Sequence, residues 1–163
     1  MTIPQPVRIV FALAALNVLL VAGAVAVLRG EQGTQPASRR RVIRPDTVPN
    51  TGLPYSPGIL VGNTLYLSGN LGRDPRTAEL VRGGIEAETR QALANIREVL
   101  KAAGMEFKDV TTVTAYITSF DDFAKFNAVY REHFPADPPA RATVQVAALN
   151  AGARVEVQMI AVK

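Results

Sequence analysis

The 163-residue chain carries 18 basic and 14 acidic side chains, one histidine and no cysteine. This length suits one globular domain with a modest appendage and is too short for two large domains. The absence of cysteine excludes disulfides, thiolate zinc sites and cysteine nucleophiles, and it leaves the redox compartment open.

The net charge of +4 comes from the first fifty residues. That segment holds six arginines against two acidic side chains, whereas the remainder holds twelve basic and twelve acidic side chains. Nonspecific phosphate binding requires a basic footprint. The balanced remainder therefore argues against a nucleic-acid partner.

An uncharged apolar stretch occupies residues 9–28 and is interrupted only by Asn17. Twenty residues of α-helix span about 30 Å, the hydrocarbon thickness of a bilayer. The stretch predicts an N-terminal transmembrane helix or a signal sequence within residues 1–29, with a buried helix as the remaining alternative. The protein is accordingly expected to be anchored in a membrane or exported after cleavage, with the side of the membrane left open. Residues 30–50, basic and containing prolines, are expected to be a linker.

Residues 51–163 predict a single α+β domain. Two apolar runs flank Gly62-Asn63, a pair typical of a tight hairpin, so strands are expected near 59–61 and 64–68. After a turn-rich loop, apolar side chains recur every three or four residues from Ile85 to Ala103, which predicts a helix with one buried face.

The second half of this domain predicts a strand, a second helix and two further strands. Residues 110–119 are rich in β-branched side chains and predict a strand. Ser119 is expected to cap a second helix, with Asp122 in the capping-box position, until Pro135 stops it. Residues 141–149 and 154–162 predict two final strands joined by a turn. The order β-β-α-β-α-β-β indicates a sheet with two helices packed on one face.

Most familiar catalytic motifs are absent from the chain. His133 is the single histidine, so no histidine pair for a metal and no Ser-His-Asp arrangement is available. No phosphate-binding loop and no GxGxxG motif occurs. Neither a metal nor a nucleotide cofactor is expected, and His133 is interpreted as structural because a cation suits the end of a helix.

Two charged residues near the C-terminus remain as candidates. Arg141 begins an otherwise uncharged strand, and Glu156 and Gln158 lie two apart on the last strand, so they share a face. A buried arginine is costly unless an acid or a bound anion accompanies it. Arg141 therefore either pairs with an acid such as Glu156 or grips a ligand carboxylate with its planar fork.

Five segments of the chain together carry a resemblance to a known family: "YSPGILVGNTLYLSG", "IEAETRQALANIREVLKAAG", "DVTTVTAYITSFDDFAKFNAVYREHFP", "PPARATVQVAAL" and "RVEVQMIAV". In this order and spacing, from about Tyr55 to the C-terminus, they resemble the RidA/YjgF family of reactive-intermediate (imine and enamine) deaminases. The resemblance implies a chorismate-mutase-like α+β fold, a homotrimer with active sites between subunits, and no cofactor. It also implies hydrolysis of 2-aminoacrylate-like imines and enamines to 2-keto acids and ammonia.

Carried over by position, the resemblance assigns roles to particular residues. Arg141 would hold the substrate carboxylate, and Glu156 would orient or activate water and manage the proton that goes to the departing ammonia. The other residues implied to bind substrate are Tyr55, Ser68, Gly69, Asn127 and Thr143. Taken singly, each of these also has a structural interpretation as core filler, strand end or helix packing.

Three positions depart from the family pattern: Pro57, Asn70 and Gln158. They leave Arg141 and Glu156 intact and bear on the range of substrates. Two alternative functions stay open, a non-catalytic trimeric module that binds a small carboxylate and an endoribonuclease-like relative. The balanced charge and the lack of a histidine pair count against the second.

Overall fold

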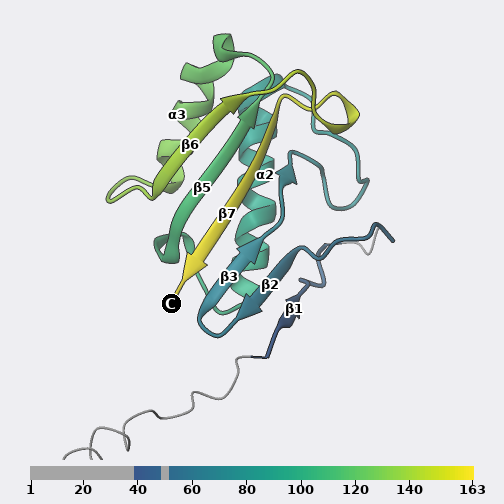
Figure 1. The fold of residues 1–163 in the computed structure, drawn as a ribbon. Coiled ribbons are helices and arrows are strands. Elements are labelled where there is room, and N and C mark those ends of the chain that lie inside the picture. The colour runs from purple at the N-terminus through teal and green to yellow at the C-terminus, as the bar shows by residue number, and fades with distance from the viewer. Residues whose placement is uncertain (1–38, 49–51) are drawn as a thin grey trace, which may run out of the picture. The chain divides into compact units, whose positions relative to one another are not determined.

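The computed structural model describes residues 39–48 and 52–163, which form a mixed sheet with two helices on one face (Figure 1). The strands are β1 (Arg41–Ile43), β2 (Gly58–Val61), β3 (Thr64–Leu67), β4 (Asn70–Leu71), β5 (Val110–Ile117), β6 (Ala140–Gln145) and β7 (Val155–Val162). The helices are α2 (Gly84–Ala102) and α3 (Phe123–His133), with short 3-10 turns η1 (Phe107–Asp109), η2 (Phe120–Asp122) and η3 (Asn150–Gly152). The expected sheet with two helices on one face is confirmed.

The strand order is β1-β2-β3-β7-β5-β6, with β4 pairing separately with β7. Among the strands of the described residues, only β5 and β6 are parallel, and α3 forms the crossover between them. The last two strands, expected to be joined by a turn, are not neighbours because β5 lies between them. The chain therefore travels from the edge of the sheet back to its centre between β6 and β7, through a connection that contains η3.

Strand β1 lies inside the segment that was expected to be a linker. It pairs with β2 in antiparallel register, and Ile43 is 4% exposed and belongs to the hydrophobic core. The β-branched residues Val42 and Ile43 have a high strand propensity, and their pairing with β2 extends the sheet despite the prolines around them.

The core lies between the sheet and the helices. Alternate residues of β5 and β7 are buried, and the helical face predicted from the periodicity of α2 packs on them. The fully buried contributors with the largest side chains include Leu93, Ile96, Leu100, Val113, Ile117, Phe126, Val155 and Met159. Burying one such side chain contributes roughly 1.5–3 kcal/mol, so this layer carries most of the stability.

Ser119 caps a shorter element than expected. Its hydroxyl accepts a hydrogen bond from the backbone N–H of Asp121 and so caps η2, which leads into α3. Asp122 closes no capping box; its carboxylate pairs with Arg154 at 3.2 Å. The backbone N–H of Arg154 donates to the buried carboxylate of Glu88 at 2.7 Å. The connection before β7 is thus tied to both helices.

Glu88 gives a stability test of this tie. Glu88→Ala is expected to lower the free energy of unfolding by about 1–3 kcal/mol, because the N–H of Arg154 loses its acceptor in a part-buried place. Glu88→Gln keeps an acceptor oxygen and should lose less. Urea denaturation measures both. Glu98→Ala on the same helix breaks only a partly exposed ion pair with Lys101 and is expected to lower the free energy of unfolding by about 0.5 kcal/mol or less. An equally small loss for Glu88→Ala would contradict a stabilising role of the bond between Glu88 and Arg154.

The predicted membrane attachment is corrected. Among the helices of residues 39–48 and 52–163, none has the combination of length and hydropathy that crossing a bilayer requires. Helix α2 has 19 residues, but its outer face carries charges such as Glu86, Arg90 and Lys101. The segment 9–28, on which the prediction of an N-terminal helix rested, lies outside the described residues. We therefore assign the protein neither a membrane anchor nor a membrane location.

Candidate functional site

Arg141 lies on the edge strand β6 and faces the helices. It pairs with Val113 of β5, which is fully buried on the helix-covered face. Its Nη2 donates a hydrogen bond of 2.7 Å to Oδ1 of Asn127 on α3. Its Cζ lies 4.4 Å from the centre of the Tyr130 ring, an arrangement that favours cation–π attraction. Helix α3 thus supplies both contacts that hold the guanidinium.

Two further rings and one hydroxyl residue complete this group. Phe126 and Phe123 place their ring centres 5.3 and 6.0 Å from the same Cζ. Thr143 pairs with the buried Ala115, so it lies on the same face of β6 as Arg141. We call Asn127, Arg141 and Thr143, with the three rings, the arginine side.

Glu156 lies near the start of β7, on the other face of the sheet, where it pairs with Tyr116 of β5 and Leu71 of β4. Its carboxylate lies directly against Gly69: a Cβ added there would overlap Oε1 and stand 2.8 Å from Cδ. The sequence places Gly69 between β3 and β4, and only a residue without a side chain leaves this room.

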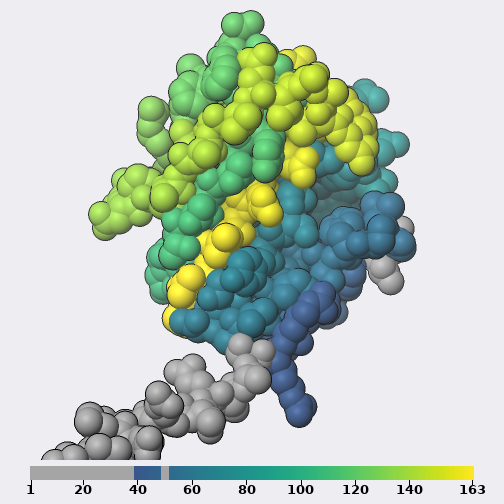
Figure 2. Space-filling view, viewed as in Figure 1, coloured from purple at the N-terminus to yellow at the C-terminus, as the bar shows by residue number. Residues whose placement is uncertain are grey.

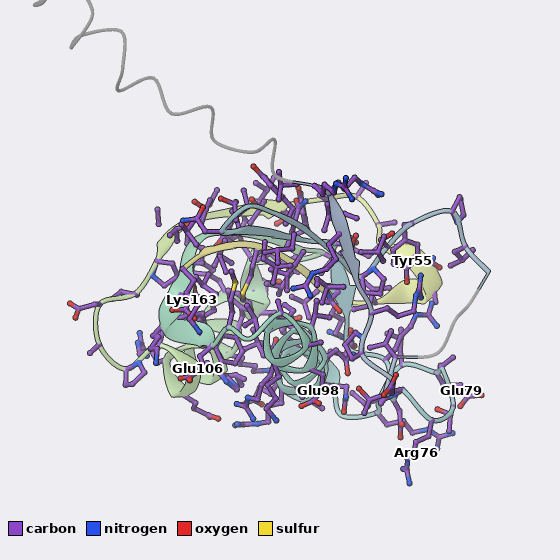
Figure 3. The ribbon with its side chains drawn as sticks, turned by 90° about the horizontal axis from the view of Figure 1, so that it is seen from below. Tyr55, Arg76, Glu79, Glu98, Glu106 and Lys163 are labelled. Carbon is purple, nitrogen blue, oxygen red and sulfur yellow. The ribbon has the colours of Figure 1, made fainter. Side chains whose placement is uncertain are left out.

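Ser68 connects Gly69 to the loop that carries Tyr55. The Ser68 hydroxyl donates to the backbone carbonyl of Ser56 at 2.7 Å, and the Ser68 N–H donates to the carbonyl of Pro57 at 3.0 Å. Tyr55 is 49% exposed and lies on the side of the domain away from Lys163, which follows the end of β7 (Figure 3). We call Tyr55, Ser68, Gly69 and Glu156 the glutamate side.

The two sides lie on opposite faces of one sheet. Arg141 is level with Val113, and Glu156 is level with Tyr116, three residues further along the same strand. Side chains alternate between faces with a period of two, so an odd separation puts them on different faces. The interpretation of Arg141 as an ion-pair partner of Glu156 within its own subunit is therefore wrong.

The guanidinium of Arg141 has no carboxylate partner among the described residues. None of the ion pairs formed by residues 39–48 and 52–163 involves it. Burial raises the pKa of Tyr130 to about 12, against the opposing effect of Arg141, so the phenol stays uncharged at neutral pH. An anion that approaches Arg141 therefore meets a positive charge that no neighbouring acid has neutralised. No group of three or more His, Asp or Glu side chains suited to a metal ion occurs in the described ranges.

Sequence reasoning missed the three rings as part of the site. Phe123, Phe126 and Tyr130 recur at helical spacing around Asn127, a pattern that predicts a buried helix face. They do pack inward, but the edge of that aromatic cluster also supports Arg141. An asparagine inside an aromatic stripe was the signal, since an amide that is partly buried among rings needs a polar partner.

Gly69 offers a test of the glutamate side. Gly69→Ala is expected to displace the flexible Glu156 carboxylate. If Glu156 has the role that the family resemblance implies, this change should lower kcat/KM on a 2-imino acid about 10- to 100-fold, because misplacing a reacting group by about 1 Å has effects of that size. The melting temperature should change little. Gly104→Ala gives the crossed control: its φ of +74° strains alanine, while an added Cβ there meets nothing within 4 Å. It should lower the melting temperature and leave kcat/KM unchanged, and the reverse pattern would contradict the placement of Glu156.

Comparison with known proteins gives consistent matches over the described domain. The family model described as Endoribonuclease L-PSP matches residues 46–163. A goat (Capra hircus) protein named 2-iminobutanoate/2-iminopropanoate deaminase is 47% identical over 124 residues, 76% of this chain and 90% of the relative.

Solved structures match over the same extent. RidA from the Antarctic bacterium Psychrobacter sp. PAMC 21119 is 40% identical with a TM-score of 0.72, over 76% of this chain and 99% of that chain. TdcF from E. coli, solved with bound serine, is 32% identical with a TM-score of 0.70, over 76% of this chain and 98% of that chain.

Proposed function

The chain belongs to the Endoribonuclease L-PSP family, which is also called the RidA/YjgF family, and we propose that it is an imine deaminase. Its substrates would be small 2-imino acids and their enamine tautomers, such as 2-iminopropanoate and 2-aminoacrylate. The goat relative, 47% identical, is named as a deaminase of 2-iminobutanoate and 2-iminopropanoate. The observation that carries the proposal is the guanidinium of Arg141, held by Asn127 and three rings but paired with no acid among the described residues.

The reaction is a hydrolysis of a C=N bond. Water adds to the imine carbon, the C–N bond of the resulting carbinolamine breaks, and a 2-keto acid and ammonia leave. Arg141 would grip the substrate carboxylate through its planar fork. Glu156 would take a proton from the attacking water and return it to the departing nitrogen. Because the imine carbon is already electrophilic, fixing the substrate and the water accounts for much of the acceleration.

Tyr55 and Thr143 are proposed to shape the place where the substrate binds. Ser68 is proposed to act less directly than its position in the sequence suggests, because its hydroxyl donates to Ser56 and holds the Tyr55 loop. The bound serine of the E. coli relative TdcF, a small amino acid with a carboxylate, supports a ligand of this class.

We propose that the active site forms between subunits of a homotrimer, because the two sides lie on opposite faces of each sheet. The face away from the helices supports this assembly, and its strands lie at the surface in Figure 2. One row of paired residues crosses it without a charge: Val42, Ile59, Tyr66, Ile160, Thr112 and Ala140. A sheet face meant for water usually alternates toward polar and charged side chains, and an exposed apolar patch marks an interaction surface. We propose that further copies of this chain cover this face of the sheet.

A ribonuclease function has less support in this chain. The single histidine, His133, contacts Arg97 at 3.1 Å and packs on Phe107. Burial and the Arg97 guanidinium lower the pKa of His133, which opposes the cationic role expected for it at the end of α3. The residues after position 50 also carry no net charge with which to attract a phosphate backbone.

The direct experiment follows release of pyruvate from 2-iminopropanoate that an amino-acid-degrading enzyme generates in the same cuvette. The full-length chain is expected to accelerate pyruvate formation above the spontaneous rate. Binding of pyruvate without any acceleration would instead favour the non-catalytic carboxylate-binding module.

A further inference from the structure

We propose that Tyr130 is a positioning residue, whose ring face sets the orientation of Arg141 and thereby the affinity for the substrate carboxylate. This inference rests on the proposed function, since it concerns the same site. It adds a residue to which neither the sequence pattern nor the resemblance gave a role.

The three rings of α3 hold the guanidinium at unequal distances. Tyr130 is the nearest at 4.4 Å from Cζ, Phe126 follows at 5.3 Å and Phe123 at 6.0 Å. Cation–π attraction is effective within about 6 Å of the ring centre and is strongest where the ring and the cation are shielded from water. Tyr130 is 5% exposed and Phe126 is fully buried, so both contacts are shielded from water, and Tyr130 makes the closer of the two.

The Tyr130 hydroxyl does not account for the contact. It is buried and makes no hydrogen bond within the described part of the chain. Its raised pKa keeps the phenol neutral, so Tyr130 and Arg141 do not form an ion pair at physiological pH. What Tyr130 offers Arg141 is the electron-rich face of its ring.

The hydrogen bond from Arg141 to Asn127 complements that face. One bond from Nη2 leaves the guanidinium free to rotate about it, whereas the ring next to it restricts the plane of the fork. A fork held in one plane loses less conformational freedom when a planar carboxylate binds with both oxygens. Removing the ring should therefore weaken carboxylate binding more than it slows the bond-breaking step.

Two substitutions separate the ring from the hydroxyl. Tyr130→Leu removes the ring face and is expected to raise KM for 2-iminopropanoate about 3- to 30-fold, with kcat within about twofold of wild type. Tyr130→Phe keeps the ring and should restore KM to within about twofold of wild type. Calorimetric titration with pyruvate is a second readout and should show the same order of affinities.

Phe134→Leu is the matched control for damage to the aromatic cluster. Phe134 is a buried ring 4.6 Å from that of Tyr130, and no contact with the Arg141 guanidinium is found for it in the described structure. It should lower the melting temperature about as much as Tyr130→Leu does, yet leave KM unchanged.

The outcomes distinguish this inference from the function beneath it. An unchanged KM in Tyr130→Leu, or an equal rise in Phe134→Leu, would overturn the positioning role. A KM in Tyr130→Phe as high as in Tyr130→Leu would assign the effect to the hydroxyl and also overturn it. If wild type neither turns over 2-iminopropanoate nor binds pyruvate, the proposed function itself fails, whatever Tyr130 does.

Discussion

Replacing Arg141 with alanine in the full-length chain is expected to lower kcat/KM for 2-iminopropanoate at least about 100-fold, because the substrate would lose the group proposed to hold its carboxylate. Arg141→Lys is expected to lower kcat/KM nearly as much. A lysine ammonium is a point charge and cannot reproduce the planar fork that lies between Asn127 and the Tyr130 ring. Coupled assays of pyruvate release measure both variants.

The fold should survive these changes. Arg141 lies on an edge strand and takes part in no ion pair among residues 39–48 and 52–163, so its removal breaks no buried pair of charges. Arg131→Ala is the matched control, since Arg131 is an exposed arginine on the last turn of α3. Wild-type rates in Arg141→Ala would eliminate the proposed site.

Mixed oligomers of two inactive variants are expected to regain activity. Arg141→Ala and Glu156→Ala each destroy one side of the site, and the two sides lie on opposite faces of one subunit's sheet. If each site takes its arginine side from one subunit and its glutamate side from the next, every mixed trimer keeps one intact site of three. Isolated mixed trimers should therefore show about a third of the wild-type activity.

Co-expression with two different tags, followed by sequential affinity steps, isolates these mixed oligomers. A pair that damages the same side, Arg141→Ala with Asn127→Ala, is the control, because no subunit then carries an intact arginine side. Its activity should not exceed that of Asn127→Ala alone. If the first pair also fails to recover, the two sides do not form one site between subunits.

Local patterns predicted most of the secondary structure. The hairpin at Gly62-Asn63, the buried face of α2 and the alternation of β5 all lie where periodicity and turn chemistry put them. Strand β1 was missed because three residues among prolines give too little alternation to stand out, and its pairing with β2 decides it. The neighbours of β6 and β7 could not be predicted from their turn, because strand order depends on long-range pairing.

The candidate site was likewise predicted only in part from the sequence. Composition argued against cysteine and histidine-pair chemistries, and the absence of phosphate-binding motifs argued against nucleotide chemistry. Arg141 then remained as the charged side chain without an evident local role. The resemblance supplied the accompanying residues. Neither composition nor the resemblance predicts that the Ser68 hydroxyl donates to the carbonyl of Ser56, or that the aromatic residues of α3 support the Arg141 guanidinium. Both are contacts between different segments of the chain, which only the folded structure brings together.

The amino-acid sequence by itself determined the class of fold, the family and the identity of the charged groups, since these follow from residue types and short-range spacing. Only the tertiary structure decided which face of the sheet each group occupies. Arg141 and Glu156 lie on different strands, so their relation depends on the register of both with β5. That register puts them on opposite faces, which excludes an ion pair within one subunit and is the reason for proposing that the site takes them from neighbouring subunits.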